Sequence, residues 1–171
     1  HQLEQHFEKS KADDYILKDD DPYFRVFSIY QNPFTEVQTS YFHKSIGGYH
    51  GAKLRIYQDV IDYYLQNNWQ TLSGHFKNNG NVAKAREMLA DMPVLNMLNT
   101  KYVIYNPGQQ PIENPYRFGN AWFVDRVQTV PSPRRELSSL NDADLKNAAI
   151  VREDRAGDWA SYSNDDEGGQ I

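Results

Sequence analysis

Two short apolar segments, separated by a long stretch of helical pattern, constrain the fold of this chain most strongly. The first, "YFRVFSIY" (residues 23–30), is apolar on both faces except at Arg25 and Ser28, which favours a central strand over an edge strand. The second, "KYVIYN" (residues 101–106), is a short strand bounded by residues that favour turns. Because helical segments lie between these strands, we expect a right-handed crossover and a mixed α/β fold.

The clearest helical pattern runs from Gly51 to Gln66. Its apolar residues recur at helical spacing and form one stripe: Leu54, Tyr57, Ile61, Tyr64 and Leu65. The polar segment that follows, residues 67–81, is predicted to be a loop with at most one helical turn. Two more helices are expected, one over residues 82–92 with Asn81 as its N-cap and one over residues 93–98 that begins with proline.

The remaining segments complete the predicted fold. Residues 1–19 are expected to be helical, with Ser10 as an N-cap and Asp13 three residues later. The second half adds three elements: a strand over 121–130, a helix over 134–140 and a strand over 148–153. The sequence therefore predicts a small mixed sheet of about four strands with helices packed on it, in a single α/β domain over residues 1–153. Residues 154–171 are polar and are expected to form a mobile tail.

Composition excludes several classes of protein. The net charge is −5, from 18 basic and 23 acidic residues, and no basic patch stands out, so a nucleic-acid partner is not expected. The chain has no cysteine, which excludes disulfides and thiolate zinc sites. It has no run of about 18 apolar residues, so no membrane span is predicted in it. An aromatic content of 13% supplies the large apolar side chains that a folded core requires.

The stretch "TSYFHKSIGGYHGAKLRIYQD", residues 39–59, is the strongest candidate for a binding site. Amides that precede a helix bind anions, and its side chains offer cations, imidazoles and an aromatic ring for a phosphate or sugar-phosphate. The candidate residues are His43, Lys44, Tyr49, His50 and Lys53. The competing interpretation is structural: Gly47 and Gly48 make a tight turn, and three aromatic rings pin the loop to the core: Tyr41, Phe42 and Tyr49.

Other patterns give no complete active site. No metal site is expected, because His43, His50 and His75 lack a carboxylate at a recognisable ligand spacing. The acidic run "KDDDP" matches no calcium loop and is interpreted as a solvated turn. No nucleophile elbow is present, and neither a catalytic residue nor a cofactor is expected. Exposed aromatic rings can stack on sugars, for which Trp69 and Trp159 are candidates, whereas Trp122 is expected in the core.

Four segments together resemble the soluble region of bacterial YfhO-like membrane proteins. They are "DPYFRVF", residues 39–59, "LNMLNTKYVIYN" and "GNAWFVDRVQTV", and they are distributed over most of the range from residue 20 to residue 152. YfhO-like proteins are polytopic and resemble the GT-C glycosyltransferases. The YfhO-like family is linked to the transfer of a sugar from a polyprenyl-phosphate carrier to a cell-envelope acceptor. The resemblance implies that this chain is a piece of such a protein, on the extracytoplasmic (periplasmic) face of the bacterial cytoplasmic membrane.

The resemblance also implies partners and a division of labour. The catalytic acid of GT-C enzymes usually lies in an early extracytoplasmic loop outside this chain, so the parent is expected to be glycosyltransferase-like and this piece not catalytic by itself. The five candidate residues match the family segment position by position. The expected partners are a lipid-linked sugar or an envelope glycan and the transmembrane region of the same parent chain, and the tail would lead into a following domain. The alternative is a non-catalytic glycan- or protein-binding scaffold module of a membrane protein.

Overall fold

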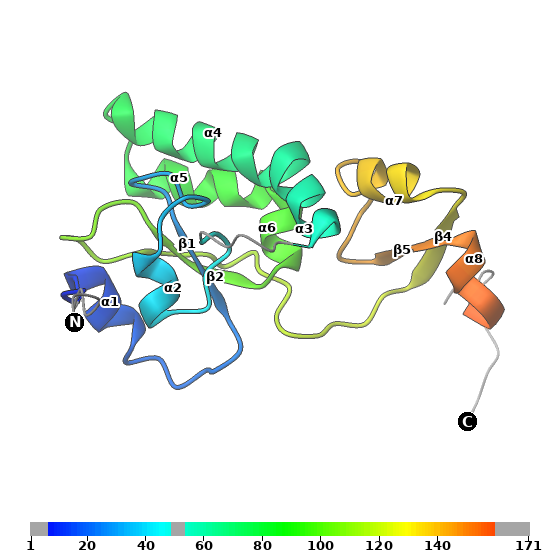
Figure 1. Cartoon of the computed structure of the whole chain (residues 1–171), viewed down its shortest axis with the longest axis horizontal. Helices are drawn as coiled ribbons and strands as arrows, with labels where there is room; N and C mark the ends of the chain where they lie inside the picture. Colours follow the sequence, from blue (N-terminus) through cyan, green and yellow to red (C-terminus); the bar gives the residue numbers. More distant parts are fainter. Residues whose placement is uncertain (1–6, 49–53, 160–171) are drawn as a thin grey trace, which may run out of the picture. The chain divides into compact units, whose positions relative to one another are not determined.

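A computed structural model describes residues 7–48 and 54–159 of the chain (Figure 1). It has the mixed α/β fold with a small mixed sheet that the sequence predicts. The chain divides into two compact units, His1–Asn120 and Ala121–Ile171, which are described separately below. The expected single domain over residues 1–153 stays a prediction.

The first unit is built on a sheet of three strands in the order β1-β2-β3. They are β1 (Arg25–Ser28), β2 (Thr100–Ile104) and β3 (Ile112–Glu113). β1 pairs with β2 in parallel, as expected for strands joined through helices, and β3 pairs with β2 antiparallel. β2 is therefore the central strand of these three. The edge of β1 that faces away from β2 forms an isolated bridge between Val26 and Ser45.

Helices α1 (Lys11–Ile16) and α2 (Gln38–Phe42) flank β1 in the sequence. The predicted capping box at the start of α1 is confirmed: the Ser10 hydroxyl accepts from the Asp13 amide, and the Asp13 carboxylate accepts from the Ser10 amide at 2.9 Å. α2 was not predicted. At the N-terminus of α2, the Glu36 carboxylate accepts a hydrogen bond from the Thr39 amide at 2.9 Å.

The predicted helix up to Gln66 is present but much longer than expected. It runs without interruption through α3 (Arg55–Val60), the π-helical turn η1 (Ile61–Leu65) and α4 (Gln66–Lys77). The prediction of a loop over residues 67–81 is therefore wrong for most of its length. Tertiary packing overrides the polar composition there, because Leu72 is fully buried and the Trp69 indole donates to the Ile29 carbonyl at 3.3 Å.

The next two helices agree with the sequence. α5 (Val82–Met88) is capped by Asn81, whose side-chain oxygen accepts from the Lys84 amide at 2.8 Å, and it continues into the 3₁₀ turn η2 (Leu89–Asp91). α6 (Pro93–Met97) begins at its proline, as predicted. The proline-rich segment after β2, expected to be all loop, contains β3, a ladder of two residues that is too short to leave a periodic pattern.

The core of this unit lies on both faces of the sheet. Ala12 and Ile16 of α1 pack with residues of the two parallel strands: Val26, Tyr102 and Ile104. Side chains alternate along a strand, so the fully buried Phe27 and Val103 point to the opposite face. Figure 1 shows α1 and α2 on one side of β1 and the long helix with α5 on the other.

The second unit is a strand–helix–strand arrangement. β4 (Arg126–Val130) and β5 (Ala148–Arg152) pair in parallel, and α7 (Pro133–Ser139) joins them. The predicted strand over 121–130 is thus correct only in its second half. The four predicted strands are divided between two sheets rather than one. α8 (Glu153–Ala156) and the turn η3 (Gly157–Trp159) consist, except for Glu153, of residues assigned to the polar tail. Ala156 of α8 is buried.

Candidate functional site

The described part of the aromatic, glycine-containing stretch lies alongside β1. The Val26 amide donates to the Lys44 carbonyl at 2.9 Å, and the Ile46 amide donates to the Val26 carbonyl at 2.9 Å. Ile46 is fully buried, and the Tyr57 hydroxyl of α3 donates to its carbonyl oxygen at 2.6 Å. This stretch is therefore attached to the sheet on one side and to the long helix on the other.

The two glycines allow this attachment. The Gly48 amide donates to the Pro33 carbonyl at 2.6 Å, and Gly48 has a φ of +95°, which side chains disfavour. A Cβ atom at Gly47 would lie 1.9 Å from the Pro33 carbonyl oxygen. Both glycines thus permit a close approach of two backbone segments, which is a structural role but differs from the tight turn that the second interpretation assigns to them.

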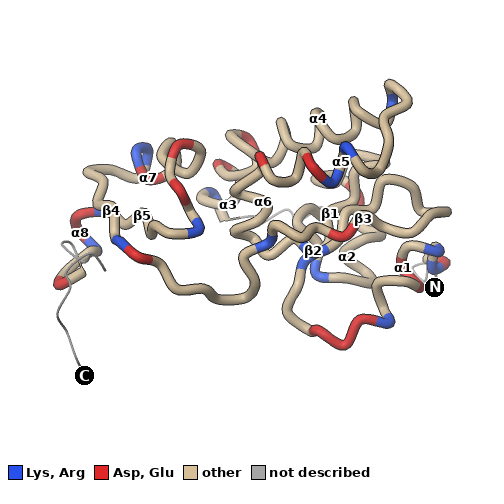
Figure 2. The backbone as a smooth tube through the Cα atoms, turned by 180° about the vertical axis from the view of Figure 1, so that it is seen from behind, with Lys and Arg blue, Asp and Glu red and all other residues tan. Residues whose placement is uncertain are grey.

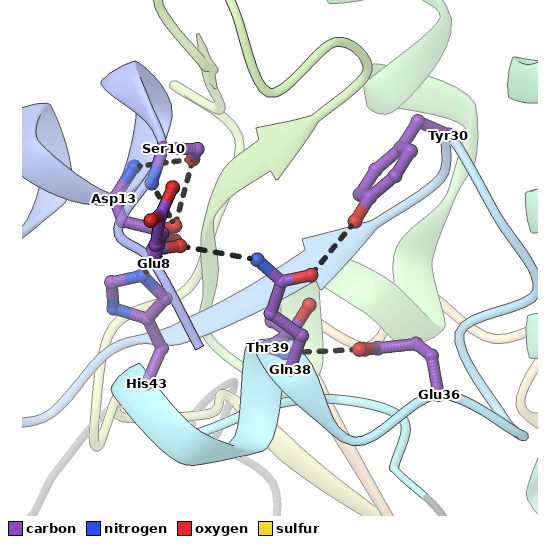
Figure 3. A network of polar contacts seen from close by, with 8 residues as sticks. All are labelled: Glu8, Ser10, Asp13, Tyr30, Glu36, Gln38, Thr39 and His43. Carbon is purple, nitrogen blue, oxygen red and sulfur yellow. Dashed lines mark hydrogen bonds and ion pairs between the residues drawn. The ribbon is translucent and has the colours of Figure 1, made fainter. Parts of the chain in front are cut away.

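His43 ends α2 and is buried against α1. Its Nε2 lies 2.8 Å from Oδ1 of Asp13, and the two side chains are 3% and 5% exposed. The other carboxylate oxygen of Asp13 accepts from the Ser10 hydroxyl at 2.7 Å (Figure 3). The carboxylate therefore stands between the serine and the histidine, which is not the order that activates a serine nucleophile. The His43–Asp13 pair joins two helices.

Lys44 has different partners. Its ammonium group donates to the Pro22 carbonyl at 2.6 Å and lies 5.6 Å from the centroid of the exposed Tyr23 ring. The side chains of His43 and Lys44 thus contact different segments, α1 and residues 22–23. The other three predicted residues lie outside the described residues and stay predictions: Tyr49, His50 and Lys53.

A row of polar side chains beside α2 was not predicted. The Tyr30 hydroxyl donates to Oε1 of Gln38 at 3.4 Å, and Nε2 of Gln38 donates to the Glu8 carbonyl at 3.5 Å (Figure 3). Burial, with the negative charges of Glu36 and Asp13, raises the pKa of Tyr30, so its hydroxyl stays protonated at neutral pH. These residues come from separate segments, and no sequence spacing links them.

A second polar cluster holds the acidic run, which lies in the loop between α1 and β1 (Figure 2). Lys101 of β2 forms ion pairs with Asp19 and Asp21, and the Tyr102 hydroxyl donates to Asp19 at 2.7 Å. Desolvation alone would raise the pKa of Asp19, but the hydrogen bonds from Lys101 and Tyr102 outweigh it and lower this pKa to about 2. The interpretation of this run as a solvated turn is wrong for Asp19 and Asp21, which bind the sheet.

Asn99 extends this cluster. It has a φ of +56°, and its side-chain amide donates to the Tyr23 carbonyl at 2.9 Å while its oxygen accepts from Arg117 at 2.9 Å. Arg117 also lies 3.6 Å from Asp21. The "LNMLNTKYVIYN" and "DPYFRVF" segments are therefore tied together through side chains as well as through strand pairing.

The other candidate groups give mixed results. Within residues 7–48 and 54–159, no cluster of three or more histidine, aspartate or glutamate residues is arranged to hold a metal ion.

Trp69 is partly buried and bonded to Ile29, whereas Trp159 is exposed. Trp122 donates to the Leu145 carbonyl at 3.1 Å and is partly buried. In the same ranges, every helix is too short or too polar to cross a bilayer.

The chain was compared with known proteins at three levels. It matches no family model, no curated protein and no solved structure.

Proposed function

We propose that this chain is an extracytoplasmic domain of a YfhO-like, GT-C-type membrane protein. In this role it supports the transfer of a sugar from a polyprenyl-phosphate carrier to a cell-envelope acceptor, and the catalytic groups lie in other parts of the parent protein. The membrane-embedded region of the parent would deliver the lipid-linked sugar to a surface that this domain helps to form.

One observation carries the proposal: three of the resembling segments meet around a single strand. "DPYFRVF" contains the first three residues of β1. Residues 44–46 bond to Val26 from one side, and β2 of "LNMLNTKYVIYN" pairs with β1 from the other. Segments that a family shares are expected to pack together when they build its common domain. The contacts among these three segments are the support for the proposal.

Lys44 is the described residue best suited to contact the ligand. It is exposed, and its ammonium group is held by the Pro22 carbonyl over the Tyr23 ring. A phosphate or an anionic acceptor would add an ion pair to this arrangement. His43 has another role in the proposal: it positions α2 through Asp13, and the sequence-based candidates Tyr49, His50 and Lys53 would complete the ligand contacts.

The test uses the full-length membrane protein in its own cell envelope. Lys44→Gln and His50→Gln are each compared with Lys84→Gln, which removes an exposed lysine of α5. We expect the first two variants to lower envelope glycosylation about tenfold at normal protein levels, because each loses a contact to the anionic group. Lys84→Gln is expected to act as the wild type.

A second candidate function is the non-catalytic scaffold module. It is favoured by the contacts of His43 and Lys44, since both side chains already have partners within the chain. Normal glycosylation by Lys44→Gln and His50→Gln, with Lys84→Gln as the reference, would support the scaffold and contradict the first proposal. The scaffold would also be supported if the two variants lowered envelope glycosylation only in proportion to a lower level of the protein itself.

A further inference from the structure

Tyr41 is largely exposed and packs beside two other aromatic rings. The residue is 61% exposed, so it does not pin the stretch to the core as the structural interpretation of the sequence suggests. Its ring centroid lies 5.5 Å from that of Phe7 and 5.0 Å from that of Phe42, with the Phe42 ring at 89°. Both distances lie in the favourable range for aromatic pairs, and part of the Tyr41 side chain stays uncovered.

Uncharged polar groups meet at Gln38, which belongs to the same helix as Tyr41. Gln38 is three residues before Tyr41 in α2, so both project from the same side of the helix. Its amide bonds to the Tyr30 hydroxyl at 3.4 Å and to the Glu8 carbonyl at 3.5 Å, and Gln31 donates to the same hydroxyl at 3.0 Å. Figure 3 shows the Gln38 side chain extended between Glu8 and Tyr30.

This combination matches the chemistry of a sugar ring. A pyranose has an apolar C–H face, which an aromatic ring buries, and hydroxyl groups at its edge, which amides and phenols bond. The bonds of Gln38 are at the long end of the range, so sugar hydroxyls can replace them at small cost. Since Gln38, Gln31 and the Tyr30 phenol carry no charge at neutral pH, the site suits a neutral sugar better than an anionic one.

We propose that Tyr41, Gln38 and Tyr30 bind one neutral pyranose ring of a glycan, with the sugar face on the Tyr41 ring. The assignment of that glycan to the cell envelope rests on the proposed function; the site itself rests on the geometry of α2 and its neighbours. The sugar-stacking role that the sequence suggests for tryptophan is thereby given to a tyrosine of the aromatic stretch.

The experiment measures binding of three neutral hexasaccharides to the 171-residue chain: cellohexaose, chitohexaose and mannohexaose. Binding is followed by calorimetry and by ¹³C–¹H shifts of the tyrosine rings. We expect Tyr41→Ala to weaken the tightest of the three about tenfold or more, and Tyr41→Phe to stay within about threefold of wild type, because phenylalanine keeps the stacking face. Gln38→Ala is expected to weaken binding less than Tyr41→Ala.

Tyr63→Ala is the matched control, because Tyr63 is 56% exposed on the long helix, and it is expected to bind as the wild type. The proposal is overturned if the wild-type chain binds none of the three sugars, or if Tyr41→Ala binds them as the wild type does. Failure of the proposed function gives a different result: sugar binding through Tyr41 persists in the chain, while Lys44→Gln and His50→Gln leave glycosylation in the full-length protein unchanged.

Discussion

Single residues in this chain act mainly through close contacts with the backbone of distant segments. Gly47 lies against the Pro33 carbonyl, Asn99 holds the carbonyl of Tyr23, and Lys44 holds that of Pro22. Each contact satisfies a carbonyl group in a connecting loop or permits two loops to touch. Residues of this kind help to position the segments that carry Lys44 and Tyr41, and they do not form part of the hydrophobic core.

Gly47→Ala is expected to destabilise the fold by about 1–3 kcal/mol, because the new methyl group has no space beside the Pro33 carbonyl. Gly74→Ala is the control, since Gly74 lies inside α4 with no atom within 4 Å of an added Cβ. That change is expected to stabilise by about 0.5–1 kcal/mol through helix propensity. Urea unfolding of the chain measures both, and equal effects of the two changes would contradict the close contact.

Asp19 makes part of the stability dependent on pH. Its pKa is lowered in the folded chain to about 2 from the ordinary value of 3.8, so the unfolded state binds its proton first as the pH falls. The stabilising contribution is therefore complete above about pH 4 and is lost between about pH 4 and pH 2.

Asp19→Asn removes this titration. Between about pH 4 and pH 2, the stability of this variant is therefore expected to fall less than the stability of the wild type. The measurement is the urea midpoint of both proteins at pH 5, 4, 3 and 2. Asp20→Asn is the control, since Asp20 is the exposed neighbour of Asp19 in the run, and this variant should follow the wild-type curve. Parallel curves for Asp19→Asn and wild type would show that the Lys101–Tyr102 contacts do not hold the carboxylate.

Among the elements, the long helix of α3, η1 and α4 has the largest influence on the first unit. Its buried residues recur through all its length after α3: Ile61, Leu65 and Leu72. Near its start, the Tyr57 hydroxyl donates a hydrogen bond to the aromatic stretch. Farther along, the Trp69 indole donates to the carbonyl of Ile29, the residue that follows β1. The helix therefore supports both the candidate stretch and the sheet.

Leu72→Ala tests whether the helix continues past Gln66. Leu72 is fully buried, so the truncation is expected to cost about 2–5 kcal/mol. Leu54→Ala, at a leucine that is 75% exposed, is expected to change stability by less than about 0.5 kcal/mol. Thermal and urea unfolding compare the two. A small effect at Leu72 would mean that residues 67–77 form a loop, as their composition suggests.

At the scale of the whole molecule, the two compact units differ greatly in what they bury. The first contains three strands with helices on both faces. Within residues 121–159, which the structure describes, the second has two strands and few buried apolar residues: Val130, Leu145, Ala148 and Ala156. A sheet of two strands is marginal without further packing. The first unit thus has the larger capacity to fold by itself.

A chain that ends at Asn120 is accordingly expected to fold, with a cooperative urea transition and dispersed amide resonances. A chain of residues 121–171 is expected to show neither, because the core formed by its described residues, 121–159, is small. Failure of the first chain to fold, while the 171-residue chain does, would show that the expected single domain over residues 1–153 is the folding unit.

The sequence by itself determined the features that depend on neighbouring residues. The capping box of Ser10 and Asp13, the Asn81 cap and the start of α6 at Pro93 all follow from groups within a few positions of each other. The α/β class followed for a similar reason, since apolar strands and helical stripes are visible as local periodicity.

Only the tertiary structure decided what distant segments do to each other. It placed Asp13 against His43 across 30 positions, bonded Tyr102 to Asp19 across 83, and kept residues 66–77 helical against their polar composition. It also left Tyr41 exposed while Gly47 took up the contact with Pro33. The physical reason is that burial and side-chain pairing depend on which surfaces meet after the chain has folded, and no pattern within a short window of sequence records that meeting.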